Sequence, residues 1–144
     1  PPPPPAPPPD PHSYPTRRSS DLTHTFLWMA AEPAKLSAKI TGIVQASDNQ
    51  LMLCAASGWE IALLWHLKRV ELPDQPQRFI PEAMQKLSVI PLPIGFDIAI
   101  SAATLPLVHR DPFDRIIIAD ALKENVSVLN IDRTFADYGT RILC

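Results

Sequence analysis

From residue 23 onward, short apolar runs alternate with longer segments of helical period, and this alternation constrains the fold more than any other feature of the chain. The predicted strands are Leu51–Cys54, Ser88–Ile90, Ser127–Asn130 and Thr140–Leu143. The predicted helices lie around Thr25–Ala31, Ser37–Ala46, Ser57–Val70, Pro81–Leu87, Ile94–Leu105 and Pro112–Asn125. Strands and helices in this order predict an α/β domain on a mainly parallel sheet.

The first 22 residues have a different composition from the rest of the chain. Ten of the 18 prolines fall in Pro1–Pro15, so residues 1–16 are predicted to be extended or disordered. A ligand for a proline-recognising domain is the alternative interpretation. The run Arg17–Leu22 also resembles translated sequencing-adapter sequence, which would make everything before Thr23 foreign. We therefore predict a tail over residues 1–22 and a single folded domain over residues 23–144.

Charge and cysteine content narrow the function classes. A net charge of -2 and a pI near 6.1 argue against a protein that holds nucleic acid by a strongly basic surface alone. Cys54 and Cys144 lie too far apart to suggest a disulfide framework or a zinc site, so both are predicted to be reduced. No apolar run approaches the roughly 18 residues that a membrane span needs. We expect a cytoplasmic protein with no membrane partner.

Three carboxylates stand where a predicted strand hands over to a helix. Glu60 follows the first predicted strand, Asp114 opens a helix, and Asp132 follows the strand that ends at Asn130. In an open parallel sheet these handover points gather at the carboxyl ends of the strands, where ligands usually bind. Because Mg²⁺ prefers oxygen ligands, converging acids there predict a metal site that activates water for phosphoester chemistry.

Helix capping is the commoner explanation for each of these acids on the sequence alone. Ser57 and Glu60 have the spacing of a capping box. Asp111 reads as an N-cap before a proline, which makes Asp114 an acid favoured by the helix dipole. Asp132 could cap a short turn. For Asp111 the capping role is the one we predict; for the three acids both explanations stay open.

Four segments of the chain have distinctive motifs: Thr23–Trp28, Ala55–Ala62, His109–Arg115 and Leu129–Phe135, the last followed by Tyr138 and Gly139. Together these segments resemble PIN-domain toxins, a family of ribonucleases. The resemblance implies a three-layer α/β/α sandwich on a mainly parallel sheet, and an endoribonuclease that hydrolyses RNA phosphodiester bonds with one or two Mg²⁺ or Mn²⁺ ions. It also implies a cognate antitoxin protein as partner, and in many members a homodimer.

The family's functional residues carry over to positions that match its motifs. Glu60, Asp114 and Asp132 match its metal-binding acids, and Asn130 takes the position of a residue that orients a ligand or water. Arg110 and Arg115 are candidates for guiding phosphates, with an ordinary solvated face as the alternative.

The chain departs from the family at its first strand, which in the family is central, apolar and ends in Leu-Asp. Here Leu22 takes the place of the first acid, and Asp21 is displaced by one residue. A one-residue slip in a strand turns a side chain to the opposite face. We therefore expect a first strand that is damaged or replaced. Two functional hypotheses follow from this expectation. The chain is either a ribonuclease toxin impaired by the missing acid, or a catalytically dead PIN-fold module that binds an antitoxin or self-associates. A different metal-dependent phosphoesterase is the third alternative.

Overall fold

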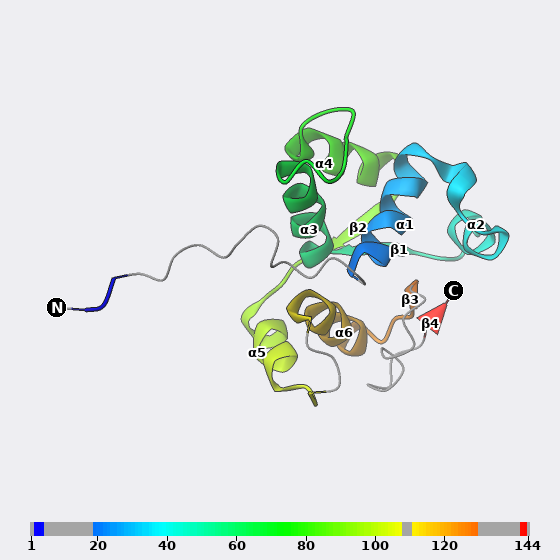
Figure 1. The fold of residues 1–144 in the computed structure, drawn as a ribbon. Coiled ribbons are helices and arrows are strands. Elements are labelled where there is room, and N and C mark those ends of the chain that lie inside the picture. The colour runs from blue at the N-terminus through cyan, green and yellow to red at the C-terminus, as the bar shows by residue number, and fades with distance from the viewer. Residues whose placement is uncertain (1, 5–18, 108–110, 130–141, 144) are drawn as a thin grey trace.

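The computed structural model describes residues 2–4, 19–107, 111–129 and 142–143. Figure 1 shows helices around short parallel strands, in the α/β arrangement predicted from the sequence. The helices are α1 (Ser19–Ala31), α2 (Ala38–Gln45), α3 (Ala55–His66), α4 (Pro76–Lys86), α5 (Phe96–Thr104) and α6 (Pro112–Glu124), with a 3-10 turn η2 (Pro33–Lys35). The strands are β1 (Leu51–Cys54), β2 (Val89–Leu92), β3 (Val128–Leu129) and β4 (Ile142–Leu143).

The strands form two separate parallel pairs. In the first, Leu51 of β1 lies opposite Val89 of β2, and the register runs on to Cys54 opposite Leu92. In the second, β3 pairs with β4 through Val128 and Ile142. Among the described residues no hydrogen-bonded ladder joins β1 to β3. The predicted parallel sheet is therefore present in two halves.

Two apolar clusters hold the helices onto these strands. One joins the end of β1 to α6 and β3 through Cys54, Ile117, Ile118 and Val128. The other joins α1, α3 and α4 and centres on Ile61, which is fully buried. Because α3 contributes to both clusters, it fixes the first strand pair relative to the helices on either side.

The N-terminal segment differs from the strand that the family resemblance implies. Residues from Ser19 onward are helical, so Asp21 and Leu22 lie near the start of α1. The prediction that Asp21 and Leu22 point to opposite faces assumed that both lie in a strand. That assumption was wrong, because both residues lie in a helix. This helix agrees with the expectation that the first strand is replaced. It also spans the predicted boundary between the tail over residues 1–22 and the domain that begins at residue 23. Within the described ranges, no helix is long and apolar enough to cross a membrane.

Candidate functional site

Glu60 is buried in α3, with 6% of its surface exposed. The helix begins at Ala55 directly after β1, and Cys54 is its N-cap without a side-chain cap. Glu60 is therefore the sixth residue of the helix, and the predicted capping box between Ser57 and Glu60 was wrong. A buried carboxylate costs free energy unless hydrogen bonds or a cation compensate it. The burial of Glu60 thus calls for another explanation than capping.

Asp114 lies in the first turn of α6 and is only 1% exposed. The cap of this helix is Asp111, whose carboxylate accepts hydrogen bonds from the amides of Phe113 at 2.9 Å and Asp114 at 3.4 Å. Pro112 occupies the first helical position, where its missing N–H is no loss. The capping role predicted for Asp111 is confirmed. Asp114 is left as a second buried acid, at the positive end of the helix dipole.

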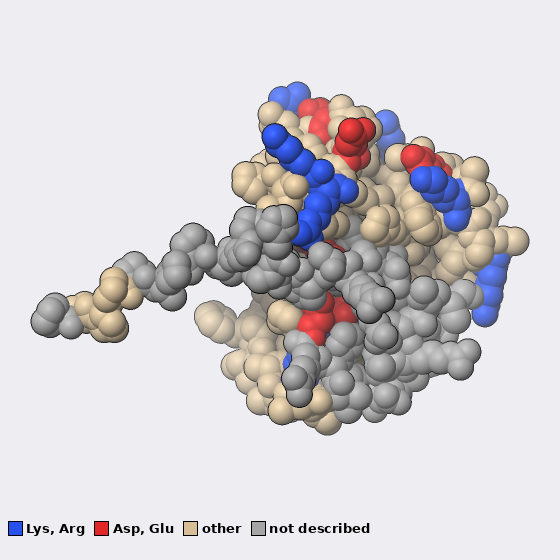
Figure 2. All heavy atoms as spheres, viewed as in Figure 1, with Lys and Arg blue, Asp and Glu red and all other residues tan. Residues whose placement is uncertain are grey.

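The residues that immediately precede the two buried acids are in contact. The rings of Trp59 and Phe113 stack with centroids 4.6 Å apart and planes at 23°. Each ring belongs to the residue immediately before a buried acid, so Glu60 and Asp114 leave the backbone close to the same contact between α3 and α6. Figure 2 shows a group of acidic atoms near the middle of the face in view.

Arg115 has a structural role in place of the phosphate-guiding role predicted for it. It is buried, and its guanidinium donates to the carbonyls of Ala102 at 3.0 Å, Ala103 at 3.3 Å, Leu105 at 2.7 Å and Pro106 at 3.0 Å. These carbonyls lie at the C-terminal end of α5, where a helix has no backbone donors for them. Arg115 therefore joins α6 to the end of α5.

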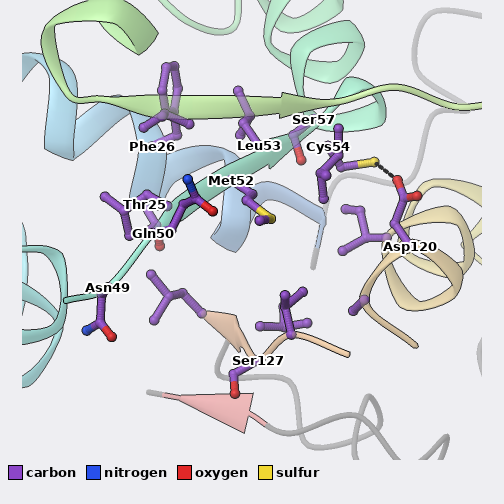
Figure 3. Close-up of a pocket in the computed structure, with 18 of the residues that line it drawn as sticks. Thr25, Phe26, Asn49, Gln50, Met52, Leu53, Cys54, Ser57, Asp120 and Ser127 are labelled. Atoms are coloured by element: carbon purple, nitrogen blue, oxygen red, sulfur yellow. Dashed lines mark hydrogen bonds between the residues drawn. The ribbon is translucent and has the colours of Figure 1, made fainter. Parts of the chain in front are cut away.

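The sequence prediction missed a buried polar pair formed by Cys54 and Asp120. The Cys54 thiol donates a hydrogen bond to Asp120 Oδ2 at 3.1 Å, across the contact between the end of β1 and α6 (Figure 3). Burial, reinforced by this hydrogen bond, raises the pKa of Cys54 to about 12. Burial also raises the pKa of Asp120, while the bond from Cys54 opposes the shift. A polar residue within the apolar stripe of α6 was the signal that could have found Asp120.

The remaining predicted site residues cannot be placed with the buried acids. Asn130, Asp132 and Arg110 lie outside the described residues, and of Asp21 only the backbone is described. In the part of the chain that the structure covers, no group of three His, Cys, Asp or Glu residues forms a metal-binding cluster. Glu60 and Asp114 supply two carboxylates, which is the donor chemistry that a hard divalent cation prefers.

Comparison with known proteins identifies the family. Over 52 residues the chain is 35% identical to Ribonuclease VapC16 of Mycobacterium tuberculosis, a match that covers 36% of this chain and 37% of that protein. The chain thus aligns with about a third of the length of this curated relative. No solved structure gives a significant match. The PIN domain matches residues 23–140, which is most of the chain. This protein belongs to the PIN-domain family.

Proposed function

We propose that this protein is built as a metal-dependent endoribonuclease of the toxin type, with Glu60 and Asp114 as the acids of its active site. The observation that carries the proposal is the burial of both acids beside the contact of Trp59 with Phe113. Membership of the PIN-domain family and the partial match to a protein named as a ribonuclease support the reaction class.

In this proposal the acids hold a divalent cation. Glu60 comes from α3 and Asp114 from α6, and Asp132, which lies outside the described residues, would be the third acid. A bound Mg²⁺ or Mn²⁺ would supply an acidified water and neutralise charge on a phosphoryl oxygen. Asn130 would orient a ligand or water, and Arg110 would guide the RNA phosphates. The burial of Glu60 and Asp114 serves to keep their carboxylates in fixed positions and away from bulk water.

The proposed partners follow from the same family membership. The substrate is RNA, the regulatory partner is a cognate antitoxin protein, and a second copy of the chain forms a homodimer. The formal net charge of -2 means that phosphate binding relies on local cations and the metal rather than on overall attraction.

The first test measures metal binding without relying on cleavage. We expect thermal melts of the full chain to rise when Mn²⁺ is added, because an ion that binds only the folded state stabilises it, by about 2.7 kcal/mol at 100 times Kd. Glu60→Gln and Asp114→Asn should each weaken the ion by at least about 10- to 100-fold, the loss seen even for residues that only orient a ligand.

The matched control is Glu124→Gln, which removes an exposed acid from the same helix as Asp114. It should leave the Mn²⁺ response unchanged. A wild-type melt that ignores millimolar Mn²⁺ and Mg²⁺, or an unaltered response in Glu60→Gln, would refute the assigned site.

A second candidate function is a catalytically dead PIN-fold module that binds an antitoxin or its own copy. The observation that favours it is the helix that begins at Ser19, because residues 19–22, where the family resemblance places the end of the strand that carries the first acid, are helical here. A metal-stimulated RNA cleavage assay beside an antitoxin-binding assay separates the two functions. Cleavage supports the nuclease, and antitoxin binding without cleavage supports the module.

A further inference from the structure

Trp59 is the most exposed of the three tryptophans, with 46% of its surface open to solvent, whereas Trp28 and Trp65 are partly buried. Its indole is nevertheless held in place, because it stacks on the partly buried ring of Phe113 with centroids 4.6 Å apart. A ring that is fixed by a neighbouring helix loses little rotamer freedom when a ligand contacts it. We call the rings of Trp59 and Phe113 the aromatic platform.

The surface of α3 around Trp59 carries small side chains. On a helix the nearest neighbours of a residue lie three and four positions away. Ala55, Ala56 and Ala62 occupy three of these four positions, and Gly58 immediately precedes Trp59. Apart from its chain neighbours and the backbone of its own helix, a Cβ built at Gly58 would meet no atom within 4 Å. Within the described residues, α3 therefore leaves room for a flat ligand beside the indole.

The aromatic platform adjoins the two buried acids. Trp59 immediately precedes Glu60, which is 6% exposed, and Phe113 immediately precedes Asp114, which is 1% exposed. A cation held by these acids, as proposed above, would contact a phosphate of RNA, and the bases that flank this phosphate would lie within one nucleotide of the platform. Every phosphate in an RNA strand is followed by a base with a flat π-face, which matches the chemistry of an exposed indole. A protein partner has no such fixed relation between a group held by the cation and an aromatic ring.

We propose that the aromatic platform stacks one unpaired RNA base next to the phosphate that is cleaved, which makes Trp59 a substrate-binding residue. This inference rests on the proposed function and adds the class of substrate. A base within a duplex is already paired and stacked, so the platform selects a nucleotide in a single strand, a loop or a bulge. Stacking uses a face that all bases share, so it holds the nucleotide without specifying the sequence. It also supplies binding free energy that a chain of net charge -2 does not obtain from overall attraction to phosphate.

The test compares two fluorescein-labelled probes on the full chain: a short single-stranded oligouridylate, and a ribose-phosphate chain of the same length without bases. The probes carry the same phosphates and differ in their bases. Ca²⁺, which also takes oxygen ligands, replaces Mn²⁺, and a gel checks that the probes stay intact. Fluorescence anisotropy should show that the wild-type protein binds the oligouridylate about 5- to 150-fold more tightly, the range expected for one stacked base. Trp59→Ala should bind both probes with nearly equal affinity, and it should bind the oligouridylate annealed to oligoadenylate as the wild-type protein does.

Two further variants separate stacking from folding. Phe96→Ala is the matched control, because it removes an aromatic ring that is 90% exposed on a different helix, α5. It should keep the wild-type preference for the probe with bases. Trp59→Phe retains a ring that can stack on Phe113, so it should keep part of the preference. If Trp59→Ala does not fold, the unaltered protein still decides the question: an oligouridylate that contains 5-bromouridine should crosslink to Trp59 under ultraviolet light.

Three results would overturn the proposal. The first is equal binding of the two probes by the wild-type protein, which would leave the platform to a protein partner. The second is an undiminished preference in Trp59→Ala, and the third is crosslinking confined to other residues. Thermal melts of the wild-type protein with Mn²⁺ test the metal site separately. A Mn²⁺ response without a preference for bases refutes the platform alone, whereas a preference for bases without a Mn²⁺ response refutes the metal site alone.

Discussion

Single buried polar residues distinguish this domain from a purely apolar α/β core. Asp120 is 3% exposed among the apolar residues of α6, and its partner is the thiol of Cys54, 66 residues earlier in the chain. With its pKa raised, the thiol stays protonated at neutral pH and donates to the carboxylate. Burial leaves the ionised carboxylate of Asp120 poorly solvated, which raises the pKa of Asp120. The hydrogen bond thus opposes ionisation of Cys54 and favours the ionised form of Asp120, while burial opposes ionisation of both side chains.

Asp120→Asn tests this balance through the pH dependence of stability. Because the pKa of Asp120 is higher in the folded state, the folded protein holds more protons than the unfolded chain above about pH 3.9, the usual value for Asp. The free energy of unfolding should therefore fall as pH rises from there through the folded pKa. Asparagine can accept the same thiol hydrogen bond without ionising, so the variant should be the more stable protein at pH 7 and lose its advantage near pH 3. Urea unfolding at several pH values measures this, and a variant less stable at pH 7 would contradict it.

At the scale of elements, α6 organises its surroundings through two residues at its N-terminal end. Asp111 caps its own N-terminus, and Arg115 serves the C-terminus of α5. A guanidinium suits this role because its planar fork of donors meets several carbonyls at once, and its charge complements the negative end of the α5 dipole. One side chain of α6 thus completes the hydrogen bonding of another helix.

Arg115→Ala should destabilise the fold far more than removal of an exposed arginine. The variant leaves the carbonyls of Ala102, Ala103, Leu105 and Pro106 without their donors, and breaking a buried charged network costs about 3–5 kcal/mol. Arg115→Lys should recover only part of the loss, because an ammonium lacks the fork. The matched control is Arg78→Ala, whose exposed pair with Asp74 spans 3.7 Å and is worth at most about 1 kcal/mol. Equal losses of unfolding free energy for Arg115→Ala and Arg78→Ala would contradict the anchoring role.

At the scale of the whole molecule, the main feature is a parallel sheet divided into two pairs. The halves are held together by the cluster of Cys54, Ile117 and Val128 and by helix contacts, and a cavity of about 380 Å³ is lined by residues of both β1 and β3. In the described chain, side-chain packing and the hydrogen bond from Cys54 to Asp120 contribute to the connection between them. A strand that bridges the edges would add hydrogen bonds to both halves.

A grafted strand should join the two halves and restore the site. Replacing residues 17–22 with five apolar residues and a terminal aspartate should raise the melting temperature and produce Mn²⁺-dependent cleavage of a structured RNA. The same graft ending in asparagine should raise the melting temperature without cleavage. Leu22→Asp alone should have little effect, because residue 22 lies in α1 and no strand aims it at the acids. Equal cleavage by Leu22→Asp and the aspartate graft would contradict this account.

Local sequence patterns determined many of the helices and strands of this protein. The apolar run Leu51–Cys54 is a strand with the predicted bounds, and the Asp-Pro pair at residue 111 begins a helix as expected. These features depend on contacts within one or two turns of chain. The importance of Glu60 and Asp114 was also proposed from their positions at strand-to-helix junctions, although their joint role with Asp132 stays a prediction.

Only the tertiary structure decided what depends on residues distant in sequence. Ser57 and Glu60 have capping-box spacing, but β1 leads directly into α3 at Ala55, which places Glu60 in the buried middle of the helix. Arg115 has the chemistry of a phosphate-binding residue, but the carbonyls at the end of α5 occupy its donors. The bond between Cys54 and Asp120 joins elements 66 residues apart. The burial and the hydrogen-bond partners of a side chain depend on how the elements pack against one another, whereas a local pattern reflects only the conformational preference of its own segment. Local patterns therefore predicted many helices and strands, and tertiary packing decided the roles of their polar side chains.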